Sequence, residues 1–206
     1  MMKIFLLIFF LIMSLSAYNS NDFYEGLDHM YGYNMSGQNE SKQKNYTKSK
    51  LALEKSIRAY ETRKKNYLYT DDVKSYFYLG LHYQYGYGIK KDYKKAFDLY
   101  TIGANLGDES AIFSLAECYR NGIGIKKNVQ TAVTLFKKAM EKGSLGSMAN
   151  IGKIYSRGEG NVKMNKITAY KYWSKCAKST ENNPKAIEFC QNQLSYMCKE
   201  NSWACK

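Results

Sequence analysis

A segment of 36 residues occurs three times in this chain, and this repeat restricts the possible folds more than any other feature. Leu79, Leu115 and Ile151 begin corresponding segments, each 36 positions after the last. In every copy a tyrosine follows four residues later, then a Gly-x-Gly triplet and a polar residue. The tyrosines are Tyr83, Tyr119 and Tyr155, and the polar residues are Asp92, Asn128 and, after a one-residue insertion, Asn165. A period of this length is typical of helix–turn–helix units that stack into a solenoid.

The repeated columns have separate physical roles. Glycines after the tyrosine predict the end of a first helix, because glycine adopts positive φ without strain. Asp92 and its counterparts are of the types that cap a following helix. Small residues recur in the first helix and aromatic residues in the second, at Gly80, Ala116 and Gly152 and at Tyr100, Phe136 and Trp173. We expect the small residues to let a neighbouring helix approach closely. The sequence predicts an all-α, right-handed α-α superhelix without a sheet.

The repeat resembles the Sel-one-like repeat (SLR) family, which is related to the tetratricopeptide repeats. The resemblance rests on the apolar–small pair, the tyrosine, Gly-x-Gly, the polar cap and a Lys-Ala pair before an aromatic residue. It covers about Ser75 to Lys178, half of the chain. It implies an exported bacterial scaffold for protein–protein interactions. A secreted, cysteine-rich subgroup binds or hydrolyses β-lactams, but that subgroup has a cysteine pair in each repeat and this chain does not.

The N-terminus has the features of a secretory signal peptide. Lys3 precedes ten apolar residues, Ile4 to Met13, and the small-residue stretch 14–17 follows. We expect cleavage after Ser16 or Ala17, with an uncleaved inner-membrane anchor as the alternative. No later apolar run is long enough to span a membrane. The expected location is the periplasm or the cell exterior.

The predicted organisation has four parts. Residues 1–17 are the signal peptide, 18–74 a divergent N-terminal repeat with a polar insertion and linker, 75–180 the three repeats, and 181–206 a disulfide-stapled capping helix and tail. An amphipathic helix is expected from Leu51 to Tyr60. Asn183 and Pro184 have the types of an N-cap and a first helical residue, so a closing helix is expected from Ala186 to Cys198.

The five cysteines predict disulfides and no metal site. Four of them, Cys176, Cys190, Cys198 and Cys205, lie in the last 31 residues. In an exported protein they indicate two bridges. Cys190 and Cys198 would be about 12 Å apart along one helix, too far to bond, which disfavours one of the three possible pairings. Of the other two we favour Cys176–Cys190 with Cys198–Cys205, as staples that hold the closing helix against the last repeat. Cys118 is expected to be a free, semi-buried thiol. Zinc is disfavoured because the chain has no C-x-x-C pair.

The sequence assigns no catalytic residue and no cofactor. Ser41-Lys42-Gln43-Lys44 matches S-x-x-K, but it lies in a Ser/Asn/Lys-rich loop, and no S-D-N or K-T-G element accompanies it. A hydrolase of the β-lactamase type is therefore the minority alternative. Three N-glycosylation sequons fall between residues 34 and 47, where a loop rich in Asn, Ser and Thr generates them easily.

Charge and the variable columns indicate a binding surface. The net charge of +13 becomes +12 when residues 1–17 are removed with their one lysine, which favours an anionic partner. The expected partner is a protein or, alternatively, an anionic cell-envelope polymer, bound by a monomer; export excludes nucleic acid. Columns that differ between repeats are not dictated by packing, which gives a hypothetical concave-face site of Tyr78, Gln84, Tyr85, Arg120, Asn121 and Arg157. The alternative is that these are ordinary solvated positions.

Overall fold

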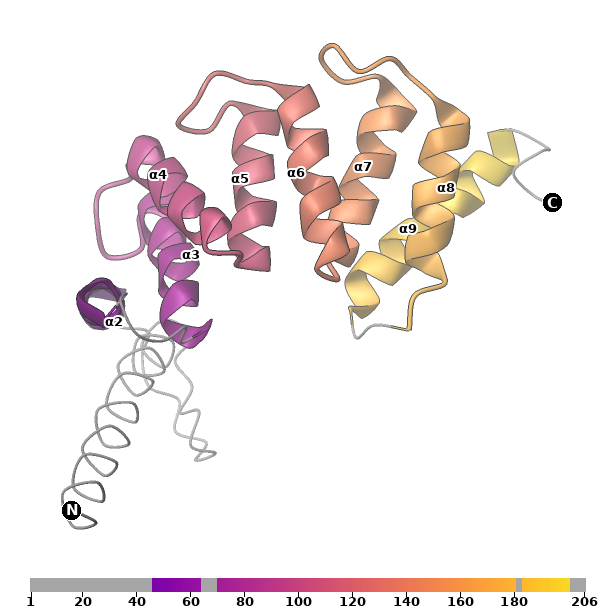
Figure 1. The fold of residues 1–206 in the computed structure, drawn as a ribbon. Helices are drawn as coiled ribbons and strands as arrows, with labels where there is room; N and C mark the ends of the chain where they lie inside the picture. The colour runs from indigo at the N-terminus through magenta and orange to yellow at the C-terminus, as the bar shows by residue number, and fades with distance from the viewer. Residues whose placement is uncertain (1–45, 64–69, 181–182, 201–206) are drawn as a thin grey trace, which may run out of the picture. The chain divides into compact units, whose positions relative to one another are not determined.

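The computed structural model describes residues 46–63, 70–180 and 183–200, and every regular element in these ranges is an α-helix. The predicted all-α helical repeat fold is confirmed for this part of the chain. The helices labelled in Figure 1 are α2 (Tyr46–Arg63), α3 (Thr70–Tyr85), α4 (Tyr93–Asn105), α5 (Glu109–Asn121), α6 (Val129–Glu141), α7 (Leu145–Arg157), α8 (Lys166–Ala177) and α9 (Pro184–Glu200).

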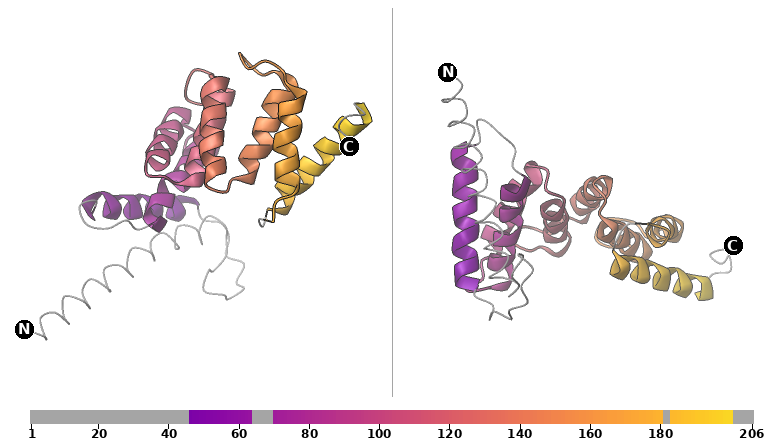
Figure 2. Two further views of the ribbon diagram at one scale, coloured as in Figure 1. Left: turned by 45° about the vertical axis from the view of Figure 1, so that its right-hand side comes forward. Right: turned by 90° about the horizontal axis from the view of Figure 1, so that it is seen from below.

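The described helices belong to two compact units, one ending at Asp108 and the other beginning at Glu109. In the N-terminal unit α2 packs against α3, and α3 packs against α4. In the C-terminal unit each helix from α5 to α9 packs against the next, and α9 also contacts α7 (Figure 2). The last three helices therefore surround a common region, which holds the candidate site.

Several sequence predictions concern residues outside the described ranges. These are the signal peptide at 1–17, the divergent repeat before residue 46, the S-x-x-K sequence at Ser41, the sequons before residue 46, and Cys205. The helix expected from Leu51 to Tyr60 is longer, because α2 runs from Tyr46 to Arg63. Its small residues Ala52 and Ser56 are buried, and Ser56 accepts a hydrogen bond from Ser75 on α3 at 3.0 Å.

The turn between the two helices of each repeat is built as the sequence predicts. The glycines at both positions of Gly-x-Gly have positive φ in all three copies, between 60° and 79°. The polar residue after the turn caps the next helix with its side chain, and its own N–H donates to the carbonyl of the repeated tyrosine. In each cap the side-chain oxygen accepts from a backbone N–H three residues later. The bonds are Lys95 to Asp92 at 3.0 Å, Thr131 to Asn128 at 3.1 Å and Thr168 to Asn165 at 2.8 Å. The backbone bonds are 2.9, 2.7 and 2.7 Å.

The recurring small residue and the recurring aromatic residue are partners. A Cβ added at Gly80 would overlap the ring of Tyr100, and one added at Gly152 would overlap the indole of Trp173. In the middle repeat Ala116 and Phe136 lie in one buried cluster. All three aromatic rings are buried. A glycine is thus paired with the larger Tyr or Trp, and an alanine with the smaller Phe, so each helix pair stays close-packed.

We predict that Gly152→Ala lowers the free energy of unfolding by about 1–3 kcal/mol, the cost typical of overpacking a core. The new methyl group would displace Trp173, whose Nε1 donates to the carbonyl of Ala149 at 3.1 Å. The same change in the Trp173→Phe background should cost less, because it recreates the pairing of Ala116 with Phe136. Urea unfolding of the four proteins of this cycle measures the coupling.

Gly146→Ala is the matched control for this cycle. Gly146 is also in α7, but its added Cβ would lie 3.2 Å from the edge of the Phe113 ring, a longer contact than at Gly152, and Phe113 is only partly buried. Its effect should be smaller than that of Gly152→Ala. Equal costs for the two single changes, or equal costs of Gly152→Ala in both backgrounds, would contradict the proposed pairing.

The last helix is held by the disulfide that the sequence favours. Cys176 on α8 is bonded to Cys190 on α9, with Cα atoms 6.1 Å apart. Cys198 is also disulfide-bonded, and its predicted partner Cys205 lies outside the described residues. Asn183 caps α9 by accepting from the N–H of Ala186 at 3.1 Å. Trp173 and Met197 join the bridge in the buried cluster between the helices, so α9 is firmly docked.

Candidate binding site

The six residues predicted to form a binding face are divided between the two units. Tyr78, Gln84 and Tyr85 lie on α3 of the N-terminal unit; Arg120, Asn121 and Arg157 lie on α5 and α7 of the C-terminal unit. The six residues come from three aligned positions of the repeat. At one of these positions, the last residue of the first helix, the side chain is exposed in every repeat: Tyr85, Asn121 and Arg157.

Arg120 is a correction to the predicted set, because it is not available to an external anion. It is only 7% exposed. Its Nε and Nη2 donate to the two carboxylate oxygens of Glu159 at 2.8 and 2.7 Å, and its Nη1 donates to Asn150 at 2.9 Å. The pKa of Glu159 is held below its ordinary value, mainly by this hydrogen bond from Arg120. Arg120 therefore joins two repeats of the same unit.

Tyr78 and Gln84 are also engaged within the protein. Tyr78 packs against the buried cluster of Leu53 and Leu79. Gln84 accepts a hydrogen bond from the hydroxyl of Tyr100 at 2.7 Å. A variable column therefore contains packing residues as well as free ones. Neither Tyr78 nor Gln84 is therefore expected to contact a partner, since a partner would have to break these interactions.

Tyr85 keeps an accessible ring, with 49% of the residue exposed. It stacks on Tyr87 at a centroid distance of 5.5 Å, and Tyr87 stacks on Tyr46 at 4.8 Å. This aromatic stack fixes the turn after α3 against α2. Asn121, in the C-terminal unit, is exposed and donates to Glu117 at 3.0 Å.

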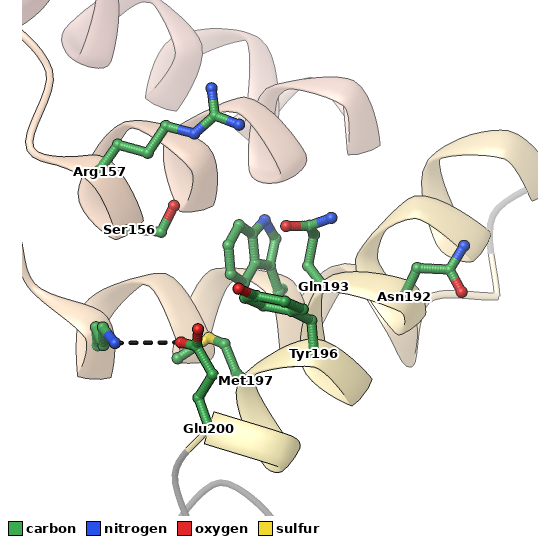
Figure 3. A pocket seen from close by; sticks show the side chains of 9 residues that line it. Ser156, Arg157, Asn192, Gln193, Tyr196, Met197 and Glu200 are labelled. Carbon is green, nitrogen blue, oxygen red and sulfur yellow. Dashed lines mark hydrogen bonds and ion pairs between the residues drawn. The ribbon is translucent and has the colours of Figure 1, made fainter.

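Arg157 lines an open cavity of about 580 Å³ in the C-terminal unit, formed by residues of α7, α8 and α9. Its volume is within the range of pockets that bind small ligands. Figure 3 shows Ser156 and Arg157 of α7 on one side, with Gln193, Tyr196 and Glu200 of α9 on the other. The lining residues are Ser156, Arg157, Lys166, Trp173, Asn192, Gln193, Tyr196, Met197 and Glu200.

Most polar groups of this cavity are engaged in fixing its walls. Ser156 donates to the carbonyl of Lys153 at 2.9 Å. Lys166 donates to Glu200 at 3.4 Å, and this ion pair joins α8 to α9. The pKa of Glu200 is lowered, first by a hydrogen bond from Tyr196 and then by one from Lys166. These contacts hold the Tyr196 ring at the cavity wall, although the residue is 60% exposed.

Three lining side chains have polar atoms without a hydrogen-bond or salt-bridge partner among the described residues: Arg157, Asn192 and Gln193. The Arg157 guanidinium is a planar group that donates hydrogen bonds, whereas each carboxamide both donates and accepts. Trp173 and Met197 supply apolar surface beside them. A few free polar groups beside an apolar wall are the usual composition of a ligand pocket.

One of these lining residues, Arg157, belongs to the site predicted from the sequence, and the others do not. The sequence indicates α9 only as a closing helix. The polar run Gln191-Asn192-Gln193 in that helix was the available signal, because three successive carboxamides do not all face a core. Which of them faces the cavity depends on how α9 docks on α7 and α8.

Two side chains outside the cavity, His82 and Cys118, belong to chemically reactive types, but both are buried in the protein. His82 and Ser49 are both fully buried, with 2.9 Å between Nε2 and Oγ. The carbonyl of Tyr87, 2.7 Å from Nδ1, can only accept, so His82 carries its proton on Nδ1. Burial lowers the pKa of His82. Burial, with Glu117 secondary, raises the pKa of the Cys118 thiol to about 12, so Cys118 stays protonated.

No helix among the described residues is both long enough and apolar enough to cross a membrane. No group of three or more His, Cys, Asp and Glu side chains in these ranges is arranged to hold a metal ion.

Solved structures similar to this chain are themselves repeat proteins. The crystal structure of a Sel1 repeat protein from Oxalobacter formigenes has a TM-score of 0.62 and 25% identity, covering 80% of this chain and 59% of that one. A protective antigen present in uropathogenic Escherichia coli strains, which displays an SLR fold, has a TM-score of 0.64 and 21% identity, covering 92% and 40%. The chain thus spans less than two thirds of either protein.

Comparison with family models gives the assignment. The Sel1 repeat model matches residues 73–108, 109–144 and 146–181. None of the curated proteins matches the sequence significantly. The three matched segments include the helix pairs α3–α4, α5–α6 and α7–α8, with the caps and small–aromatic pairs described above. Together they make up more than half of the chain, which therefore belongs to the Sel1 repeat family.

Proposed function

We propose that this protein is an exported Sel1 repeat scaffold that binds a partner protein through the open cavity formed by α7, α8 and α9. Sel1 repeats typically mediate protein interactions. The observation that carries the proposal is the cavity itself, whose lining includes the uncommitted polar side chains Arg157, Asn192 and Gln193. The exposed Arg157 is of a residue type favoured in binding hot spots.

Two features support export. Lys3 and the apolar segment Ile4 to Met13 have the pattern of a signal peptide. The Cys176–Cys190 bridge belongs to the chemistry of oxidising compartments. Fractionation of cells producing the full chain should place the protein outside the cytoplasm, and deletion of residues 1–17 should retain it inside. Retention of both forms in the cytoplasm would refute export.

Site-specific photo-crosslinking tests the scaffold role. The full chain is produced in its native cells with a benzoylphenylalanine at Asn192, an exposed position that lines the cavity. The control carries it at Lys137, an exposed position on α6 that does not line the cavity. We expect a discrete protein adduct from position 192 only, and the purified captured protein should then bind the purified chain. Identical adducts from both positions, or adducts with polysaccharide alone, would reject a protein partner at this cavity.

A further inference from the structure

We propose that the cavity between α7, α8 and α9 is a binding site for an acidic peptide segment, in which Arg157 takes a carboxylate and the carboxamides of Asn192 and Gln193 take peptide groups. This inference rests on the proposed scaffold function and specifies the chemistry of the partner.

The charge balance of the cavity favours one negative charge. Its charged side chains are Arg157, Lys166 and Glu200, and the last two are paired at 3.4 Å. Glu159, whose pKa Arg157 also helps to lower, is already bridged by Arg120. Arg157 is thus the charge that has no ion-pair partner among the described lining residues. Residues 109–206 add a positive background, with 16 Lys and Arg against 7 Asp and Glu.

The kind of anion follows from the donors available. A planar guanidinium matches the two oxygens of a carboxylate with a pair of parallel hydrogen bonds. A phosphate group, with about two charges, is usually held by several cations, and this cavity offers one. The single uncommitted arginine therefore fits the side chain of Asp or Glu, or a chain terminus.

The remaining lining groups suit a peptide. Main-chain N–H and C=O groups alternate, and a carboxamide can satisfy either because it both donates and accepts. Asn192 and Gln193 provide two carboxamides on α9, and Figure 3 shows Gln193 opposite Arg157. Met197 and the buried Trp173 give an apolar wall for a neighbouring side chain.

The test begins with selection of random dodecapeptides displayed on phage against the full mature chain. We expect the enriched peptides to share an Asp or Glu, or a required free C-terminus. The best peptide is then synthesised with its acidic residue intact and with that residue replaced by its amide. Fluorescence anisotropy measures the affinity of both peptides for the wild type, for Arg157→Gln and for Lys137→Gln. Lys137→Gln removes one charge from an exposed position on α6, away from the cavity.

Arg157→Gln should lower the affinity for the acidic peptide by about tenfold or more, as expected for loss of a charge-assisted hydrogen bond. Lys137→Gln should lower this affinity by less than about twofold. The amide peptide should bind the wild type and Arg157→Gln alike. Enrichment of peptides without an acidic group, equal weakening by both variants, or competition by glycan fragments or inorganic phosphate with no peptide selected would overturn the proposal. If a partner protein crosslinks at position 192 and binds wild type and Arg157→Gln with equal affinity, the scaffold function is supported and only the carboxylate site is refuted.

Discussion

Replacing Arg120 with methionine is expected to lower the free energy of unfolding by about 3 kcal/mol, because it leaves the carboxylate of Glu159 partly buried without its partner. In the folded protein Arg120 donates to both oxygens of Glu159 and to Asn150. The side chains of the ion pair are 9% and 19% exposed, so water replaces little of the lost interaction. Urea unfolding of the full chain at neutral pH measures the difference.

A solvated ion pair provides the control. Lys94 and Asp98 pair on α4 with side chains 65% and 53% exposed. Lys94→Gln should change the stability by less than about 1 kcal/mol. The double variant Arg120→Met with Glu159→Leu should be more stable than Arg120→Met alone, since the Glu159 carboxylate that lost its partner is also removed. Glu117, whose carboxylate lies 3.6 Å from Arg120, is unchanged in both variants. A cost for Arg120→Met no larger than that of Lys94→Gln would show that the ion pair contributes little.

The same ion pair predicts a pH dependence. The pKa of Glu159 lies below its ordinary value of 4.5 in the folded protein, so the unfolded chain binds the proton more readily. The stabilisation is fully present above the unfolded pKa and is lost as pH falls below about 4.5, through the folded pKa. The difference in stability between the wild type and Arg120→Met should therefore shrink in acid. A difference that stays constant down to pH 3 would exclude titration of Glu159 as its source.

Removal of the Cys176–Cys190 disulfide by Cys176→Ala with Cys190→Ala should cost about 3 kcal/mol, since the bridge closes a loop of about 15 residues. The loss should be concentrated in α9, which the bridge holds against α8. Hydrogen exchange measured by mass spectrometry should therefore show faster exchange in residues 184–200 than in α5 and α6. Because α9 supplies Asn192 and Gln193, peptide binding should weaken in parallel.

Cys118→Ala separates the bridge from the simple loss of a buried sulfur. Cys118 is buried and free. Its replacement creates a small cavity in the core and should leave exchange in α9 unchanged. If α9 exchanges at the wild-type rate in the double variant, packing around Trp173 and Met197 is sufficient to dock it.

Local features of the repeat were predictable because their physical causes are local. Positive φ after the repeated tyrosine requires glycine, and an Asn or Asp at the next helix start satisfies exposed N–H groups within three residues. The small residue at position 80, 116 or 152 also implied a close approach of helices. Cys190 and Cys198 could be kept apart because helix geometry fixes the distance between them.

The sequence alone determined the helix–turn–helix unit, its caps and the columns that face the core, since these depend on contacts repeated in every copy. Only the tertiary structure decided which variable positions are free. Arg120 and Arg157 both stand in variable columns near the end of a first helix, yet Arg120 is paired with Glu159, 39 residues away, and Arg157 lines the cavity. When the residue type at one aligned position differs between repeats, no contact common to all repeats determines that residue. Whether that side chain meets a distant partner or open solvent depends on how the helices are packed.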